Sequence, residues 1–202
     1  MDWHLGWFSP LRKELCVDIF GIFSAFGLSA SAGLNAYIPL LVVALLARFT
    51  DLLQLKEPWD ALASWWIIGL LVVLSLVEFF ADKVPAVNHI NDVIQSFVRP
   101  AAGAVVFAAN AKILTDISPV LSLVCGLFIA GGVHAVKSVA IRPAVTATTA
   151  GAGNVPVSIL EDVISTIVSI LSIIVPVLMT VILIVVIAWW VSRRRNRRKY
   201  LN

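Results

Sequence analysis

Six ionisable side chains fall within a short stretch of an otherwise apolar chain, and together they predict ion pairing, anion binding or proton transfer. Glu78 and Asp82 are four residues apart, so a helix would place them on one face, where two carboxylates repel unless a cation or proton intervenes. Arg99 stands between apolar stretches, and an arginine in mid-bilayer needs a carboxylate or an anionic ligand, because its insertion costs at least about 2.5–3.5 kcal/mol. The other members of this group are Lys83, His89 and Asp92.

A second group of charges surrounds Arg142, which also lies between apolar stretches. His134 and Lys137 are three residues apart and precede Arg142 on the expected helix. We expect each arginine to take carboxylates as counter-ions, and these carboxylates would also be the proton acceptors. The expected partners are Glu78, Asp82 and Asp92 for Arg99, and Glu161 and Asp162 for Arg142.

Two interpretations of these charges stay open. In the first, they are static ion pairs at the interface and at a helix-turn-helix corner. In the second, the pairs open to admit an anion to Arg99, Arg142 and Lys137, or a proton to the carboxylates. His134 is either an interhelical hydrogen-bond partner or a proton relay, because an ordinary histidine titrates near neutral pH.

We expect neither a metal site nor an enzyme. Asp82, His89 and Asp92 offer oxygen and imidazole donors, but their spacing matches no known ligand pattern. The sequence contains no Ser-His-Asp order, phosphate-binding loop, HExxH or dinucleotide fingerprint. No metal, cofactor or catalytic residue is therefore predicted.

Two asparagines mark expected breaks in helices. Asn35 in "AGLNAYIP" and Asn154 in "GAGNVP" each lie in a glycine-rich stretch that a proline follows. Glycine and β-branched residues weaken a helix, so freed backbone groups there could line a binding cavity together with the asparagine side chains. The alternative is a glycine-mediated packing seam between helices.

Two short segments resemble each other. "SFVRPAAGAV" (96–105) and "SVAIRPAVTA" (138–147) share an Arg-Pro-Ala core followed by small residues. Each segment places a cation beside an apolar stretch that is too short to cross a bilayer as a straight helix, which predicts two re-entrant or broken helices. Such backbone is tolerated at membrane depth only where protein or water covers it, and opposed segments of this kind occur in transporters with inverted repeats.

The composition predicts a polytopic membrane protein. Apolar residues make up 60% of the chain and charged residues 13%, against about 45–50% and 25% in soluble domains. We expect an all-α membrane bundle of about four full spans plus two re-entrant or broken helices, with a five-span arrangement as the rival. The predicted organisation is an interfacial segment (1–15), a transmembrane domain (16–191) and a basic cytoplasmic tail (192–202).

Basic residues concentrate at the C-terminus. Six of the 15 cations lie in the last ten residues, "RRRNRRKYLN". The positive-inside rule places such a cluster in the cytoplasm, where it would attract anionic lipid. The predicted partners are therefore membrane lipids, with no role for nucleic acid.

Four stretches carry a family resemblance: "GLSASAGLNAYIPLL", "VEFFADKVPAVNHINDVI", "RPAAGAV" and "KSVAIRPAVTATTAGAGNVPVSILEDVIS". Over roughly residues 20 to 170 the chain resembles a family of bacterial integral membrane proteins, catalogued as domain of unknown function four-one-two-six. The resemblance implies a multi-pass protein, which we expect in the bacterial cytoplasmic (inner) membrane. It implies no substrate.

The sequence favours a small membrane transporter, or a lipid flippase or scramblase, for an anionic solute or lipid headgroup, with proton coupling left open. Arg99, Arg142 and Lys137 would attract the anion, and Asn35 and Asn154 would line the broken helices. The alternative is a non-transporting membrane scaffold or assembly factor whose charges are structural ion pairs.

Overall fold

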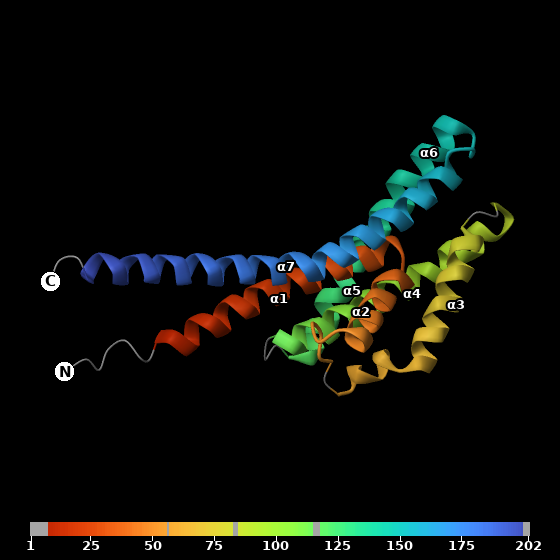
Figure 1. Ribbon diagram of the computed structural model, residues 1–202. Coiled ribbons are helices and arrows are strands. Elements are labelled where there is room, and N and C mark those ends of the chain that lie inside the picture. The colour runs from red at the N-terminus through yellow and green to blue at the C-terminus, as the bar shows by residue number, and fades with distance from the viewer. Residues whose placement is uncertain (1–7, 56, 83–84, 115–117, 200–202) are drawn as a thin grey trace.

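The protein folds into a bundle of helices (Figure 1). The structure, a computed structural model, describes residues 8–55, 57–82, 85–114 and 118–199 of the 202. No strand occurs among the described residues, which confirms the predicted all-α class. The helices are α1 (Phe8–Leu34), α2 (Tyr37–Phe49), the 3-10 helix η1 (Trp59–Ala63), α3 (Trp65–Ala81), α4 (Pro85–Leu114), α5 (Pro119–Val136), the π-helix η2 (Lys137–Ile141), α6 (Arg142–Thr149) and α7 (Asn154–Lys199).

Small polar residues and prolines begin several helices. The Ser64 hydroxyl accepts a hydrogen bond from the N–H of Ile67 at 3.4 Å and so caps α3. Helices α4 and α5 begin with Pro85 and Pro119. A proline is tolerated there because its missing N–H would have no partner within the first turn.

Both predicted breaks are present. Between α1 and α2, Asn35 Oδ1 accepts hydrogen bonds from the N–H groups of Tyr37 and Ile38, both at 3.1 Å, and so begins the new helix. After α6 the chain passes through the left-handed region, with φ of 89° at Gly151. Glycine adopts this conformation at little cost, and α7 then begins at Asn154.

Neither Arg-Pro segment forms a re-entrant hairpin, and the alternative of a broken helix holds only for the second segment. Helix α4 continues through Arg99 and Pro100 as one helix of 30 residues. Pro143 follows the π-helix η2, and the N–H of Arg142 bonds to the carbonyl of Lys137 five residues earlier. The wider π turn relieves the clash between a proline ring and the carbonyl four residues before it.

Three segments of the described chain are long and apolar enough to cross a membrane: Asn91–Asn110, Pro119–Thr149 and Asn154–Pro176. Shorter apolar helices cover Gly21–Leu34, Tyr37–Phe49 and Trp65–Ala81. These helices indicate a membrane protein. The 46 residues of α7 would measure about 69 Å, more than twice the roughly 30 Å of the hydrocarbon core.

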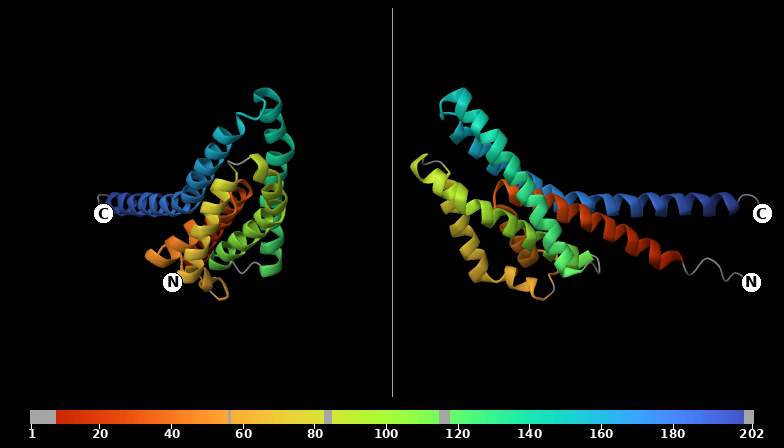
Figure 2. Two further views of the ribbon diagram at one scale, coloured as in Figure 1. Left: turned by 90° about the vertical axis from the view of Figure 1, so that its right-hand side faces the viewer. Right: turned by 180° about the vertical axis from the view of Figure 1, so that it is seen from behind.

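The bundle has two distinct ends. The start of α1 and the end of α7 lie on one side, whereas α6 and the first turns of α7 project together on the opposite side (Figures 1 and 2). We call this opposite side the hairpin end. Helix α1 packs against α4, α5 and α7, and α4 packs along α5. The last turns of α1, α3 and α5 therefore point towards the hairpin end, while α4 and α7 start there (Figure 2).

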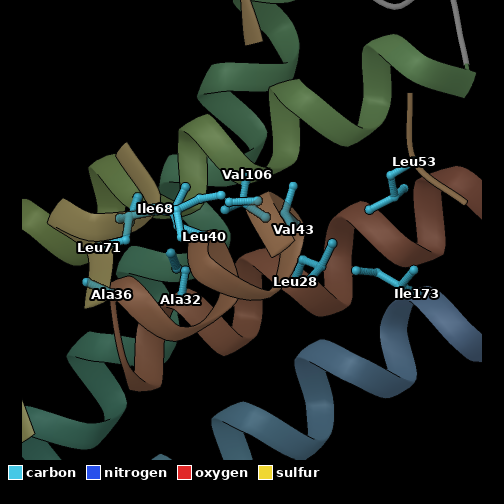
Figure 3. Close-up of a cluster of buried hydrophobic side chains, with 13 residues drawn as sticks. Leu28, Ala32, Ala36, Leu40, Val43, Leu53, Ile68, Leu71, Val106 and Ile173 are labelled. Atoms are coloured by element: carbon cyan, nitrogen blue, oxygen red, sulfur yellow. The ribbon is translucent and has the colours of Figure 1, made fainter. Parts of the chain in front are cut away.

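An apolar cluster fills the middle of the bundle (Figure 3). It joins α1 to the helices around it, and its side chains are almost completely buried. Packing of this kind holds helices together in a membrane, where lipid is as apolar as the core. The larger members are Leu28, Leu40, Val43, Leu53, Ile68, Leu71, Val106 and Ile173.

Small residues allow α4 and α5 to approach closely. Gly103 and Gly126 face each other, and the Ser29 hydroxyl of α1 lies 3.2 Å and 2.8 Å from their carbonyl oxygens. A Cβ added at Gly126 would lie 2.6 Å from the Cβ of Phe107, which leaves no room for a side chain. We call Ser29, Gly103 and Gly126 the glycine seam.

Candidate functional site

Near the hairpin end, four parts of the chain bring charged side chains into contact. They are the end of α3, the first half of α4, the run from α5 to α6, and the start of α7. Each side chain is buried or half-buried. We call the set the charged network; its members are Glu78, Asp82, Asp92, Arg99, His134, Lys137, Arg142 and Glu161.

Glu78, Arg99 and His134 form the inner layer of the network. Nη2 of Arg99 lies 2.9 Å from Oε1 of Glu78, and their side chains are each only 1% exposed. Nη2 also lies 3.8 Å from Oδ2 of Asp82. Arg99 stands near the middle of the candidate span Asn91–Asn110. A carboxylate partner at this depth offsets the cost of burying the guanidinium.

The hydrogen bonds of His134 define its protonation state. Nη1 of Arg99 lies 3.2 Å from Nδ1 of His134, and a guanidinium can only donate, so Nδ1 is an acceptor. Nε2 therefore carries the proton and donates to the Ser96 hydroxyl at 3.2 Å, while that hydroxyl donates to the carbonyl of Asp92 at 2.8 Å. His134 is accordingly a neutral partner of Arg99.

Asp82, Asp92, Lys137, Arg142 and Glu161 form the outer layer. Nη2 of Arg142 lies 3.1 Å from Oδ2 of Asp82 and 3.5 Å from Oε2 of Glu161. Nη1 lies 3.4 Å from Oδ1 of Asp92. The side chain of Arg142 is 11% exposed and that of Asp92 is 30% exposed. One guanidinium thus contacts carboxylates from α3, α4 and α7.

Lys137 connects the outer layer to the break in α1. Its Nζ lies 2.7 Å from Oε2 of Glu161 and donates to the carbonyl of Leu34 at 2.9 Å. Leu34 ends α1, and the last carbonyls of a helix carry partial negative charge without an intrahelical partner. The ammonium group therefore neutralises both a carboxylate and a helix terminus.

The two layers lie at different depths along the bundle. On α4, Asp92 precedes Arg99 by seven residues, or about 10 Å. Since α4 starts at the hairpin end, Arg99 is the deeper of the two. The α5–α6 run gives the same order, because His134 lies eight residues before Arg142, or roughly 12 Å deeper.

The carboxylates differ in how well they are satisfied. Asp82 accepts from Asn91 at Oδ1 (2.7 Å) and from Ser158 and Arg142 at Oδ2 (3.0 and 3.1 Å). Glu78 accepts only at Oε1, and its buried Oε2 has no hydrogen-bond partner among the described residues. Three further buried atoms of α4 share this state in the described part of the chain: Oε1 of Gln95, Nε of Arg99 and Oδ1 of Asn110.

The structure brings most of the predicted site residues together. Two partner assignments change: Asp92 contacts Arg142 instead of the expected Arg99, and Asp162 accepts a hydrogen bond from Asn35 at 3.0 Å. Asn35 therefore borders the network through α7. Asn154 instead bonds Thr146 across the hairpin at 3.0 Å, away from the network.

Two predicted residues cannot be placed in the site. Lys83 lies outside the described residues. His89 lies in the first turns of α4, but its side chain is not among those described. Among the described residues, no group of three or more His, Cys, Asp or Glu side chains could hold a metal ion.

Sequence reasoning missed several polar partners of the network. Ser158 precedes Glu161 by three residues, so helical spacing could have placed it on the same face of α7. Ser96 precedes Arg99 on α4 by the same spacing, whereas the carbonyl of Leu34 had no such signal. The π turn that orients Lys137 and Arg142 was also missed, although Pro143 made some distortion necessary.

A model of one protein family, described as Domain of unknown function (DUF4126), matches residues 22–194. The match includes both layers of the charged network and the glycine seam. Neither a curated protein nor a solved structure matches the chain. The chain belongs to the DUF4126 family.

Proposed function

We propose that this DUF4126 protein is a small membrane transporter, or a lipid flippase or scramblase, for an anionic solute or lipid headgroup. The anion would bind Arg142 in the outer layer, with Lys137 as the second cation. One observation carries the proposal: a single partly exposed guanidinium is held between carboxylates of three helices at one end of the bundle.

The distances around Arg142 support an exchangeable site. Its contacts with Asp92 and Glu161, at 3.4 and 3.5 Å, are longer than the roughly 2.7–2.9 Å of a strong charge-assisted hydrogen bond. A phosphate or carboxylate of the substrate could approach more closely and form two parallel hydrogen bonds with the planar guanidinium. The substrate would thus replace the long contacts of Arg142 with Asp92 and Glu161 by shorter hydrogen bonds.

Substrate binding at Arg142 would also act on the helices. Arg142 begins α6, while its carboxylate partners belong to the end of α3, to α4 and to α7. Exchanging these contacts for a substrate would loosen the hairpin of α6 and α7 from α3 and α4. We expect a shift of this hairpin to expose the anion alternately to the two sides of the membrane.

The proposal is tested with purified protein in liposomes. One preparation contains fluorescent phosphatidylglycerol, whose transfer between leaflets is followed with a membrane-impermeant quencher, and another traps radiolabelled inorganic phosphate. We expect the wild type to accelerate one of the two processes and Arg142→Gln to reduce the rate at least tenfold. Equal rates for wild type, Arg142→Gln and protein-free liposomes would reject the proposal.

Arg48→Gln is the matched control. Arg48 lies in the last turn of α2 outside the network, where its guanidinium stacks on Trp65 at 5.1 Å from the ring centroid. This variant removes the same charge and the same hydrogen-bonding groups from the chain. The proposal requires its rate to equal that of the wild type, and an equal loss in both variants would point to a general effect of charge.

The proposed setting is the bacterial cytoplasmic membrane, with the basic tail in the cytoplasm bound to anionic lipid. The start of α1 and the end of α7 lie on the same side of the bundle, which supports a cytoplasmic position for both (Figure 1). A cysteine at Asn202 should react with a membrane-impermeant thiol reagent only after intact cells are opened. Labelling in intact cells would reverse the orientation.

The rival function is a non-transporting scaffold or assembly factor, and one observation favours it. Each cation of the network has a carboxylate at 3.1 Å or less, as expected of static ion pairs: Arg99 at 2.9 Å, Lys137 at 2.7 Å and Arg142 at 3.1 Å. In this case Arg142→Gln would lower only thermal stability, and neither liposome preparation would differ from protein-free liposomes.

A further inference from the structure

We infer that Glu78 is the proton-binding residue of the charged network, and that its protonation releases Arg142 for an anion by way of Asp82. The proton site follows from the burial and charges of the network and does not depend on transport. Only the identity of Arg142 as the anion site rests on the proposed function.

The charge balance of the network leaves room for one proton. Four carboxylates contact three cations among the described residues, so the fully ionised network carries one excess negative charge. Uncompensated charge is costly in a low-dielectric interior. Binding one proton makes the network neutral: an O–H bond of hydronium breaks, the O–H bond of the carboxylic acid forms, and a water molecule leaves.

Glu78 is the carboxylate that gains most from this proton. It is 2% exposed, yet a single guanidinium N–H satisfies one of its oxygens, and the other has no partner among the described residues. Asp82 has hydrogen-bond partners on both oxygens, and Asp92 is partly exposed to solvent. Neither oxygen of Glu161 has a hydrogen-bond partner among the described residues, but its Oε2 lies 2.7 Å from Nζ of Lys137 and 3.5 Å from Nη2 of Arg142, and two nearby cations favour its charged form. A buried carboxylate with few donors favours its neutral form.

Groups from four elements face Glu78, and none offers a better proton site. Arg99 and Lys137 are cations, and His134 is fixed as a neutral acceptor by Arg99. Asp82, one turn along α3, is held as an anion by its own donors. The facing groups are Tyr37 on α2, Asp82 at the end of α3, Arg99 on α4, and His134 and Lys137 on the α5–η2 run.

Asp82 provides the connection between the layers. Its Oδ2 lies 3.1 Å from Nη2 of Arg142 and 3.8 Å from Nη2 of Arg99. When Glu78 becomes neutral, Arg99 loses its counter-ion and attracts Asp82 instead. Asp82 then moves away from Arg142, whose contacts with Asp92 and Glu161 measure 3.4 and 3.5 Å. One proton in the inner layer thus removes the shortest contact that Arg142 makes with the carboxylates of the network and opens its guanidinium to an anion.

The test is infrared difference spectroscopy on the purified full-length protein in liposomes, recorded across a pH titration. We expect the wild type to show the carbonyl-stretch band of a neutral carboxylic acid, which disappears as the pH rises. Glu78→Gln should lack the band, and Asp92→Asn, which removes a partly exposed carboxylate of the same network, should keep it. A band that persists in Glu78→Gln, or that is absent from the wild type at every pH at which it stays folded, overturns the inference.

A second variant covers a failure of Glu78→Gln to fold. Glu78→Asp keeps an acid at the same place in a different geometry, so the band should shift in frequency, and an unshifted band counts against Glu78. For the connection through Asp82, we use sulfate as a probe that stays ionised throughout the titration. Wild-type protein should bind sulfate at least tenfold more tightly below the band's midpoint than above it, whereas Glu78→Gln should bind equally tightly at both pH values.

The outcomes separate the inference from the proposed function. A carboxylic-acid band that depends on Glu78, without any transport in liposomes, keeps the proton site and rejects the transporter. Transport that needs Arg142, without a band that depends on Glu78, keeps the transporter and rejects the proton site. Sulfate binding that is weak or unchanged with pH in the wild type rejects the connection through Asp82.

Discussion

Arg99 and Arg142 occupy the same local sequence, Arg-Pro-Ala, yet their surroundings differ in depth, partners and packing. Arg99 lies inside an uninterrupted α-helix, fully buried, with one close carboxylate and one neutral histidine. Arg142 follows a π turn, is partly exposed and contacts three carboxylates. The Arg-Pro-Ala motif thus places a cation in both segments, whereas the depth of the cation in the bundle and the local helical pitch decide how many carboxylates contact it.

Packing below the inner layer is tight. The glycine seam lies just below the inner layer, since Gly103 follows Arg99 by one turn of α4. Gly132, two residues before His134, is exposed and has no atom within 4 Å of where a Cβ would stand. The face of α5 that meets α4 is therefore closely packed, whereas the face with Gly132 is open.

Removing Arg99 should produce the largest effect. Arg99→Ala leaves Glu78 buried without a cation, and breaking a buried ion pair in this way costs about 3–5 kcal/mol. Arg142→Ala should cost less, about 0.5–3 kcal/mol, because Asp82 keeps Asn91 and Ser158 as donors. Thermal unfolding in detergent measures both, and equal losses would erase the distinction between the two layers.

The unpaired charge of Glu78 should account for most of the stability lost in Arg99→Ala. The double variant Arg99→Met with Glu78→Leu removes both members of the pair and should recover much of the stability lost in Arg99→Ala, because apolar replacements of a buried pair are often neutral. Persistent destabilisation in the double variant would assign the loss to packing of the arginine side chain.

A packing change should come next in size. Gly126→Val inserts a side chain between α4 and α5 and should cost about 1–3 kcal/mol or more through overpacking. Gly132→Val, on the same helix in open space, is the matched control and should stay within about 0.5 kcal/mol of the wild type. Similar unfolding temperatures for the two variants would show that the seam is not tightly packed.

The smallest effect should come from Asp92. Its side chain is 30% exposed and its contact with Arg142 is 3.4 Å long, so Asp92→Asn should cost only about 0.2–1 kcal/mol. The loss should shrink further at high salt because exposed pairs are screened. A loss as large as that of Arg99→Ala would place Asp92 in the buried part of the network.

Sequence reasoning identified the residues of the network better than their pairing. A buried arginine requires a counter-ion, so the participation of Glu78 and Asp82 followed from composition and spacing. The partner of Asp92 did not, because Asp92 lies two turns from Arg99 on α4 and reaches the outer layer instead. Contacts between helices depend on their rotation and depth, which spacing within one helix does not determine.

The prediction of a re-entrant or broken helix at the first Arg-Pro segment failed for a related reason. Residues 101–111 are too short to cross a membrane alone, but they form the second half of a helix whose first half is polar. The charged side chains of that polar half meet partners on the other helices of the bundle. The breaks at Asn35 and before Asn154 were predictable because glycine and asparagine act locally on the backbone.

The π turn of η2 makes the chain sensitive to length. A π turn closes its hydrogen bonds over five residues instead of four, so η2 holds one residue more than α-helical pitch would allow. Deleting a single residue between 138 and 141 would remove this extra residue, so the segment could return to α-helical pitch with Arg142 facing roughly the same way. In a regular α-helix the same deletion would turn every later side chain by about 100°, so the tolerance of η2 to a deletion reports on whether the wider turn itself is required.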